Sequence, residues 1–267
     1  MRADYHLHTA YSFDSSSPLT AQIQAAIDHG LTEICLTDHY EPPYPGLPLW
    51  QFDLEKRAQE LHTLKGSPLL KEITVRQGAE VGLLDLPGQR EHIHHLVKQY
   101  QLDFVIASCH MCQGEDPYYP EFFHGKTRSE GFARYLAEFC HLITTIDDFS
   151  VAGHIDYPSK GCPYEDKMLR YSDAPEELDT LFRYLIHHGK GLEINTSIFR
   201  ALKQDTLDTA WLRRYKELGG EIITIGSDAH TPEPVGYGWD AACQLLKTVG
   251  FRYVTTFRQM QPIFHQI

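Results

Sequence analysis

Histidine is the first residue type in this chain that suggests a particular chemistry, because 16 of the 267 residues are histidines. Neutral imidazole is the commonest side-chain ligand for transition metals, so the excess raises the hypothesis of a metal site. His6 and His8 lie at the end of a short apolar segment with one residue between them. Residues two apart on a strand point to the same side, so these two imidazoles are placed to chelate one ion.

Other residues of ligand type follow apolar segments further along the chain. One histidine or aspartate at such a place is more often structural, for example as a helix cap. The whole set is more informative, because strands that close a parallel barrel bring the residues that follow them to one rim, where the active sites of such barrels lie. The candidate metal ligands are His6, His8, Asp14, His39, Glu80, His110, His154, Asp228 and His230.

Six imidazoles and three carboxylates are more than the roughly four to six ligands of a single ion, so this set predicts two to three divalent metal ions. The set contains no thiolate, and Zn²⁺, Mn²⁺ and iron all suit it. Cys109 and Cys112 form a CxxC pair, but one such pair is weak support for zinc or redox chemistry. We expect the six cysteines to be reduced and to have packing roles.

The segments that must position these residues alternate between short apolar runs and amphipathic helical stretches, which is typical of a parallel sheet. Nothing in the alternation indicates a linker, so we expect one α/β domain over residues 1–267. Seven strands are expected, and residues 253–257 are a candidate for an eighth. The seven expected strands are Ala3 to Leu7, Glu33 to Thr37, Ile73 to Ala79, Phe104 to Ser108, Ser150 to Ala152, Gly191 to Ile194 and Glu221 to Ile225.

Start and stop signals place helices between these strands. Helices are expected from Pro18 to His29, from Ser129 to Ile146, from Asp173 to His188 and from Asp205 to Gly219. Two long loops rich in proline and aromatic residues, 40–52 and 110–127, each follow a strand. Loops in that position wall the active site of an α/β barrel, so we expect both to border the substrate.

The charge balance limits the classes of partner. Lys and Arg number 24 and Asp and Glu 36, which gives a net charge of 24 − 36 = −12. Such a chain suits a small cationic or zwitterionic ligand better than nucleic acid or an anionic membrane surface. No run approaches the roughly 18 apolar residues of a membrane span, and the N-terminus builds no signal-peptide core. We therefore expect a cytoplasmic protein that is a monomer or a small homo-oligomer.

The candidate ligands lie in motifs that resemble those of the PHP (polymerase and histidinol phosphatase) superfamily, in order and across nearly the whole chain. Two further segments, 192–197 and 123–127, resemble its histidinol-phosphate phosphatase branch. The motifs that carry the superfamily resemblance are Asp4-Tyr5-His6-Leu7-His8-Thr9, Leu36-Thr37-Asp38-His39, Gly78-Ala79-Glu80, Ser108-Cys109-His110, Gly153-His154-Ile155-Asp156 and Gly226-Ser227-Asp228-Ala229-His230.

The resemblance implies a distorted (β/α)7 TIM-like barrel with three metal ions in a cleft at the carboxyl ends of the strands. A bridging Glu80 is physically reasonable, because an anion between two cations reduces their repulsion. Asp14 stands where some relatives carry histidine. The resemblance assigns one ion to His6, His8, Glu80 and Asp228, a second to Asp14, His39 and His230, and a third to His110, His154 and the second oxygen of Glu80.

The implied activity is hydrolysis of L-histidinol phosphate to L-histidinol and phosphate, a step of L-histidine biosynthesis. A metal-bound hydroxide would attack phosphorus in line while the other ions hold the non-bridging oxygens. Lys160, where the family more often has arginine, and Arg200 are expected to contact the phosphate. Asp228 or His230 is expected to pass a proton to the leaving alkoxide.

The organic half of that substrate carries an ammonium and an imidazole, which an acidic pocket rich in aromatic residues would suit. The candidate walls of this pocket are Tyr118, Tyr119, Phe122 and Phe123. The same side chains are equally suited to packing the loop onto the barrel.

Other functions share parts of this pattern. An amidohydrolase-type metal hydrolase also begins with a His-x-His pair, but it commonly needs a lysine at the end of strand four, where this chain has Ser108-Cys109-His110. A phosphoesterase of the same superfamily acting on phosphotyrosine, a nucleotide or a sugar phosphate stays open, whereas the net charge disfavours a polynucleotide. A non-catalytic module is disfavoured because all nine candidate ligands are present.

Overall fold

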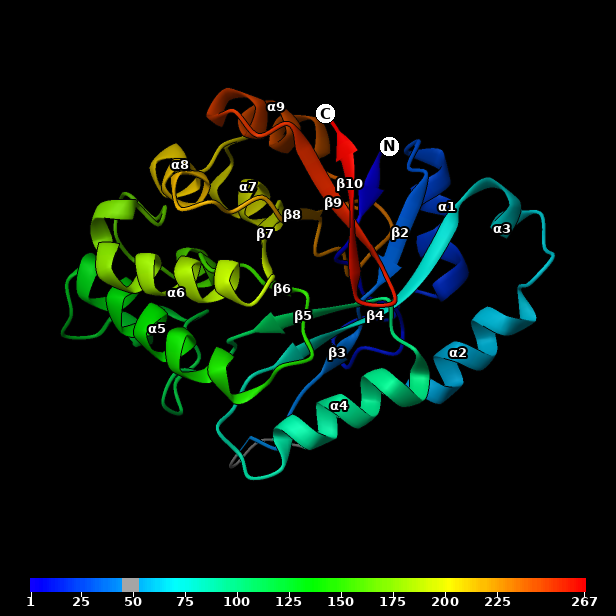
Figure 1. Cartoon of the computed structure of the whole chain (residues 1–267), viewed down its shortest axis with the longest axis horizontal. Helices are drawn as coiled ribbons and strands as arrows, with labels where there is room; N and C mark the ends of the chain where they lie inside the picture. The colour runs from blue at the N-terminus through cyan, green and yellow to red at the C-terminus, as the bar shows by residue number, and fades with distance from the viewer. Residues whose placement is uncertain (45–52) are drawn as a thin grey trace.

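The computed structural model describes residues 1–44 and 53–267, and it shows a nearly closed barrel of seven parallel strands surrounded by helices (Figure 1). All seven expected strands are present, with ends shifted by a few residues. Most of their residues are buried, as expected for strands covered on both faces. The barrel strands in spatial order are β1 (Ala3–Asp4), β2 (Glu33–Leu36), β4 (Thr74–Gly82), β5 (Phe104–Ser108), β6 (Val151–Ala152), β7 (Gly191–Asn195) and β8 (Ile223–Gly226).

The barrel closes between its last and first strands. Tyr5 N donates to Ile225 O at 3.0 Å, and Asp228 N donates to His6 O at 2.7 Å. Leu7 and Ala229 continue the same parallel pairing beyond the ends of β1 and β8. Closure therefore brings the first and last candidate ligands of the sequence to neighbouring positions on one rim.

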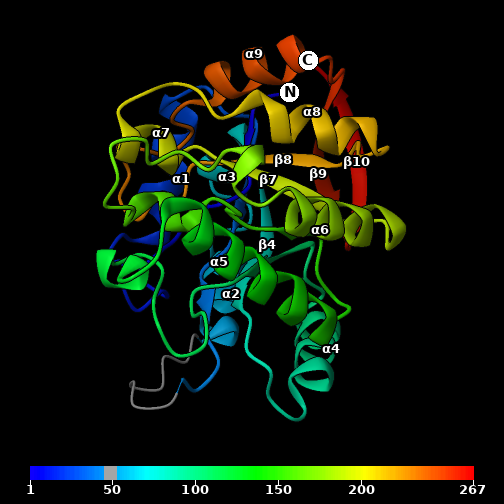
Figure 2. The same ribbon diagram turned by 90° about the vertical axis from the view of Figure 1, so that its left-hand side faces the viewer.

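Helices form a ring outside the strands, as the two views show together (Figures 1 and 2). Within residues 1–44 and 53–267, no helix combines the length and the apolar character needed to cross a bilayer. The helices are α1 (Leu19–Asp28), α2 (Leu54–Thr63), α3 (Leu69–Glu72), α4 (Gln89–Tyr100), α5 (Arg128–Leu142), α6 (Pro175–His187), α7 (Ser197–Leu202), α8 (Thr209–Glu217) and α9 (Trp239–Val249), with short 3-10 turns η1 (Pro120–Phe123), η2 (Ile143–Thr145), η3 (Tyr157–Lys160) and η4 (Tyr171–Asp173).

The expected helix boundaries are correct to within a few residues. The start expected at Ser129 lies at Arg128, because Thr127 caps the helix and forms a reciprocal capping box with Glu130 of its first turn. The helix expected from Asp205 begins later, after Asp208, whose side chain accepts a hydrogen bond from the Ala210 backbone N. Both shifts follow the side chain that satisfies the free amide groups at the start of the helix.

Two parts of the sheet structure differ from the expectation. The candidate eighth strand is β9 (Tyr253–Arg258), but it pairs antiparallel with β10 (Gln261–Gln266) in a separate hairpin and not with the barrel. The reason is the short reversal at residues 259–260, which returns the chain directly onto β9. A short strand that the sequence analysis missed, β3 (His39–Tyr40), pairs with the carboxyl half of β4.

The hairpin covers the amino-terminal end of the barrel. Phe257 packs against the Phe104 ring, with 5.1 Å between the ring centroids, and these two residues share a buried cluster with Tyr5. The Tyr5 hydroxyl donates to Phe257 O at 3.1 Å and accepts from Phe257 N at 2.9 Å. The chain therefore closes one end of the barrel with its own last strands and leaves the opposite end, where the strands finish, for the site.

A fully buried ion pair fixes the carboxyl end of β2. Arg57 of α2 donates to Asp38 Oδ2 at 2.9 Å, and its guanidinium also donates to the backbone carbonyls of Leu36 and Gly78. The other Asp38 oxygen accepts hydrogen bonds from the Thr9 backbone N and side chain. Helix α2, strands β2 and β4 and the loop after β1 are thus joined through one charge pair.

We predict that Arg57→Ala strongly destabilises the fold. Removing one partner of a buried pair leaves the other charge without compensation, which costs about 3–5 kcal/mol in the free energy of unfolding. Urea denaturation of the metal-free protein measures this. The neighbouring variant Lys56→Ala, which removes a solvent-exposed pair with Asp53, should leave the denaturation midpoint nearly unchanged. Equal midpoints for the two variants would contradict this prediction.

Candidate metal centre

All nine candidate ligands meet at the carboxyl end of the barrel, around a cleft of about 600 Å³. They come from the ends of β1, β4 and β5, from β3, and from the loops after β1, β6 and β8. Three groups of these side chains have ligand atoms within 4.8 Å of one another. They overlap the three expected sites, but Glu80 is not in the first group and His8 also belongs to the second. The groups are His6, His8 and Asp228; His8, Asp14, His39 and His230; and Glu80, His110 and His154.

The first group is built on the closed seam between β1 and β8. His6 Nε2 and His8 Nε2 lie 3.1 Å apart, as expected for two imidazoles on the same side of a strand. Asp228 Oδ1 lies 3.3 Å from His8 Nε2, and Glu80 Oε2 lies 3.1 Å from His6 Nε2. Gly226 allows this approach, since a Cβ at that position would collide with the His6 side chain.

The second group lies nearer the solvent. Asp14 Oδ2 lies 3.3 Å from His39 Nε2 and 3.0 Å from His230 Nε2. The ring of His8 stacks on that of His230 with 4.0 Å between centroids, so the first and second groups are in contact. Asp14 therefore lies within reach of both imidazoles with which it was expected to share an ion.

The third group centres on Glu80. Its Oε1 atom lies 3.2 Å from His110 Nε2 and 2.8 Å from His154 Nε2, while Oε2 faces the first group. The parallel register of β3 and β4 pairs His39 directly with Glu80. Glu80 thus has one oxygen toward each of two groups, which is the arrangement expected of a bridging carboxylate.

The charges of these groups shift one another strongly. Burial would raise the pKa of Glu80, but the imidazoles of His6, His39 and His110 hold it well below its usual range. Burial and the neighbouring imidazoles of His230 and His39 lower the pKa of His8 to about 3. Burial opposes protonation of His110, yet Glu41 and Glu80 raise its pKa to about 10. In the metal-free cluster at neutral pH, His110 is therefore protonated, whereas His8 is neutral and Glu80 is ionised.

The donor set fits divalent cations. Glu80 Oε2 and His39 Nδ1 are buried without a hydrogen-bond partner. The Nε2 atoms of His6 and His8 face each other at 3.1 Å, and a cation bound to both would coordinate the lone pair of each. Cys109 and Cys112 are free thiols in the hydrophobic core, and no cysteine joins a metal-type group in the part of the chain that the structure describes.

Buried carboxylates support the ligands from behind. Glu193 Oε1 lies 2.6 Å from His6 Nδ1. His8 Nδ1 lies 3.0 Å from the Ser12 hydroxyl, which donates to Asp38. Such contacts fix the orientation of an imidazole and increase its basicity toward a metal.

A third supporting carboxylate, Glu41, was missed by the sequence analysis. Glu41 Oε1 lies 2.8 Å from His110 Nδ1. The imidazoles of His110 and His39 overcome the effect of burial and lower the pKa of Glu41 to about 2. Glu41 follows His39 by two residues, so the alternation of side chains along a strand was the available signal.

Asp228 is held in an unusual backbone conformation. Its φ of 55° lies in the left-handed region, which aspartate tolerates better than most residues. The buried carboxylate of Asp4 accepts hydrogen bonds from Ser227 N at 2.9 Å and from Gly236 N at 2.8 Å. These bonds hold both ends of the loop that carries Asp228 and His230.

Lys160 and Arg200 both line the cleft, as expected. Lys160 Nζ lies 3.1 Å from Asp228 Oδ2. Arg200, on α7, donates to Ser227 O at 3.0 Å and lies over the Tyr237 ring. Two cations therefore stand beside the candidate metal ligands, where an anionic group would be expected to bind.

The aromatic residues of the loop after β5 divide between the two roles that the sequence left open, lining the cleft and packing the loop. Tyr118 and Tyr119 are exposed and line the cleft, together with Tyr157. Phe122 and Phe123 are buried in the core, because the turn η1 directs them under α5. Of the two loops expected to wall the substrate, residues 45–52 lie outside the described part of the chain.

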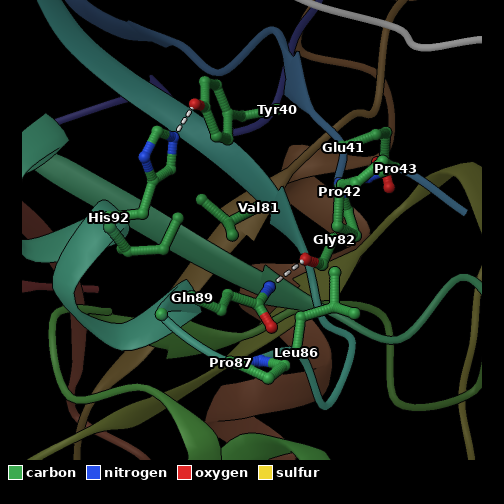
Figure 3. Close-up of a pocket in the computed structure, with 12 residues that line it drawn as sticks. Tyr40, Glu41, Pro42, Pro43, Val81, Gly82, Leu86, Pro87, Gln89 and His92 are labelled. Carbon is green, nitrogen blue, oxygen red and sulfur yellow. Dashed lines mark hydrogen bonds between the residues drawn. The ribbon is translucent and has the colours of Figure 1, made fainter.

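A second cavity, of about 460 Å³, adjoins the cleft on the outer side of β4. Figure 3 shows Glu41 at its edge beside Pro42 and Pro43, with Val81 and Leu86 on the facing side. Glu41 borders both cavities.

Comparison with known proteins gives consistent matches. A family model described as the PHP domain matches residues 4–197. Histidinol-phosphatase of Lactococcus lactis subsp. lactis (strain IL1403) is 32% identical over 261 residues, which are 97% of this chain and 96% of that protein. The solved structure of histidinol phosphate phosphatase from the same organism, complexed with Zn, L-histidinol and phosphate, matches with a TM-score of 0.88 and 32% identity over 98% of each chain.

A solved structure from Listeria monocytogenes matches with a TM-score of 0.69 at 17% identity, covering 91% of this chain and 100% of that chain. At that identity the match supports the fold alone.

We predict that metal binding releases protons. His110 has a raised pKa of about 10, so it is protonated at neutral pH in the metal-free protein, and a metal that takes its lone pair must displace that proton. The apparent metal affinity should therefore rise with pH from 6 to 9. Titration calorimetry with Zn²⁺ in two buffers of different ionisation enthalpy measures the release. Identical heats in both buffers would contradict the prediction.

Proposed function

The chain belongs to the PHP domain family, and on that premise we propose that it is a metal-dependent phosphomonoesterase that hydrolyses L-histidinol phosphate to L-histidinol and phosphate. The observation that carries this proposal is the convergence of nine ligand-type side chains at one end of the barrel, where seven of them line a cleft together with two cationic side chains. The full-length similarity to histidinol-phosphatase supports this substrate, and with it a role in L-histidine biosynthesis. We also propose that residues 1–267 form one catalytic domain.

The nine ligands are proposed to hold two to three divalent ions. The solved relative contains zinc, which supports zinc as one ion of this site; the same ligand set would accept iron or manganese. When bound, such ions would neutralise phosphate oxygens and lower the pKa of a water molecule enough to make it a nucleophile at neutral pH. The proposed sites are His6, His8, Glu80 and Asp228 for one ion, Asp14, His39 and His230 for a second, and His110, His154 and Glu80 for a third.

The residues of the chain itself prepare the phosphate for reaction. Lys160 and Arg200 reach the cleft from η3 and α7, and we assign them to the phosphate oxygens. A dianionic monoester repels a nucleophile that carries negative charge, and fixed cations in a cleft with little water reduce that repulsion. Arg200 is held over the Tyr237 ring and by Ser227 O, so little side-chain entropy is lost when it binds.

The leaving alcohol needs a proton, and we assign its delivery to Asp228 or His230. Both lie on the loop after β8, and both line the cleft. The organic half of the substrate would lie against Tyr118 and Tyr119, whose faces suit its cationic groups.

The first test is an assay of phosphate release with the purified protein, beside its metal content by elemental analysis. L-Histidinol phosphate, phosphotyrosine, a nucleoside monophosphate and a sugar phosphate form the panel. We expect two to three divalent ions per chain and a kcat/KM for histidinol phosphate well above that for the other esters. A preference for another ester would overturn the substrate, and a metal-free active enzyme would overturn the metal dependence.

We predict that Lys160→Ala and Arg200→Ala each lower kcat/KM for histidinol phosphate by about 10²-fold, because each removes one charge that stabilises the transition state. Product inhibition by inorganic phosphate should weaken in parallel.

Arg213→Ala is the matched control for these two variants. Arg213 is an exposed arginine of α8 and does not line the cleft. Its kinetics should equal those of the parent. A variant at Lys160 or Arg200 that retained both kcat/KM and phosphate inhibition would exclude that residue from phosphate binding.

A further inference from the structure

Glu41 lies between two candidate ligands that belong to different proposed ions. Its Oε1 atom lies 2.8 Å from His110 Nδ1 and 3.2 Å from His39 Nδ1. Its other oxygen accepts a hydrogen bond from the Tyr44 hydroxyl at 2.9 Å. The Glu41 side chain is buried, so both oxygens are engaged by the protein and not by solvent.

We propose that Glu41 is a positioning residue of the metal centre, which orients the His110 and His39 imidazoles toward the second and third ions. The inference rests on the metal-dependent function proposed above. Nothing in the motifs that identify the family singles out this carboxylate, and its role follows from its contacts.

The orientation of His110 carries most of the argument. A neutral imidazole has one N–H and one lone pair, and the partner of one nitrogen decides which nitrogen can bind a metal. Here Nδ1 lies 2.8 Å from the Glu41 carboxylate and keeps its proton as a donor, so the proton that a metal displaces is the one on Nε2, which lies 3.2 Å from Glu80 Oε1. Glu41 therefore selects the tautomer whose lone pair points into the third group.

His39 is placed in the same way but less tightly. Its Nε2 faces Asp14 Oδ2 at 3.3 Å, in the second group. Its Nδ1 is 3.2 Å from Glu41 and 3.0 Å from Glu80, without hydrogen-bond geometry to either. The negative charges of Glu80 and Glu41 together favour the proton on Nδ1, which leaves Nε2 for a metal.

A buried carboxylate is costly unless its charge is compensated. Glu41 meets this cost with the two imidazoles and the Tyr44 hydroxyl, and all three contacts lie beside the cleft. A residue that served packing alone would not need this charge. The alternative role is that of a direct ligand, because Glu41, His39 and His110 also have ligand atoms close together.

The test is Glu41→Gln, which keeps the size of the side chain and removes its charge. Zinc affinity is measured by competition with a chromophoric chelator, and bound zinc at saturation by elemental analysis. We expect the same number of zinc ions at saturation as in the parent, with about 10- to 100-fold weaker binding of at least one of them. Thermal unfolding of the metal-free variant is recorded beside these measurements.

The matched control is Glu33→Gln. Glu33 is also a buried glutamate, but its carboxylate contacts Tyr5 and Arg76 near the opposite end of the barrel. This variant should bind zinc as the parent does, whatever its effect on unfolding.

Each other outcome decides against the inference. Unchanged zinc affinity in Glu41→Gln, with or without a lower unfolding temperature, would reduce Glu41 to a structural role. A loss of one zinc ion at saturation would make it a direct ligand instead. A parent protein that binds no zinc, iron or manganese would overturn the proposed function itself, which separates that failure from the failure of this inference.

Discussion

The structure depends above all on concentrating nine ionisable side chains in one largely buried place without leaving their charges uncompensated. Glu80 is the centre of this arrangement, since its two oxygens face different groups of imidazoles. A carboxylate in that position would be costly by itself, and imidazoles crowded together would resist protonation. Placed together, the carboxylates and the imidazoles compensate one another's charge. The lone pairs of the imidazoles can then point toward the centre of the cluster.

That arrangement needs rigid support, which the barrel supplies in two ways. The seam between β1 and β8 fixes His6 and His8 against Asp228, and the register of β3 on β4 fixes His39 beside Glu80. Behind them stand further buried carboxylates: Glu193 behind His6, Asp38 behind Ser12, and Asp4 behind the loop of Asp228. The polar interior is therefore organised outward from the metal centre in successive layers of hydrogen bonds.

Much of this could be predicted from the sequence, and the reason is geometric. Apolar runs followed directly by His, Asp or Glu define both the strands and the rim, so the seven strands and the convergence of the nine ligands follow from one pattern. Tertiary contacts decided the rest. Phe122 and Phe123 are aromatic residues of the same loop as Tyr118 and Tyr119, so the sequence does not distinguish the two pairs. In the structure the side chains of Phe122 and Phe123 lie in the hydrophobic core. The sequence of the turn between β9 and β10 does not indicate whether these strands join the barrel. Glu41 belongs to none of the recognised motifs, and its contacts with His110 and His39 appear only in the structure.

The hairpin at the closed end of the barrel has a consequence for the order in which the protein forms during its synthesis. Tyr5, which precedes the first ligand, is anchored to Phe257, which is 252 residues further along the chain. A ribosome has therefore made the first pair of histidines long before their anchor exists. The nascent chain cannot complete its metal cluster until Asp228 and His230 have emerged, so a chain that stopped before them would carry the leading His-x-His pair without the ligands that later surround it.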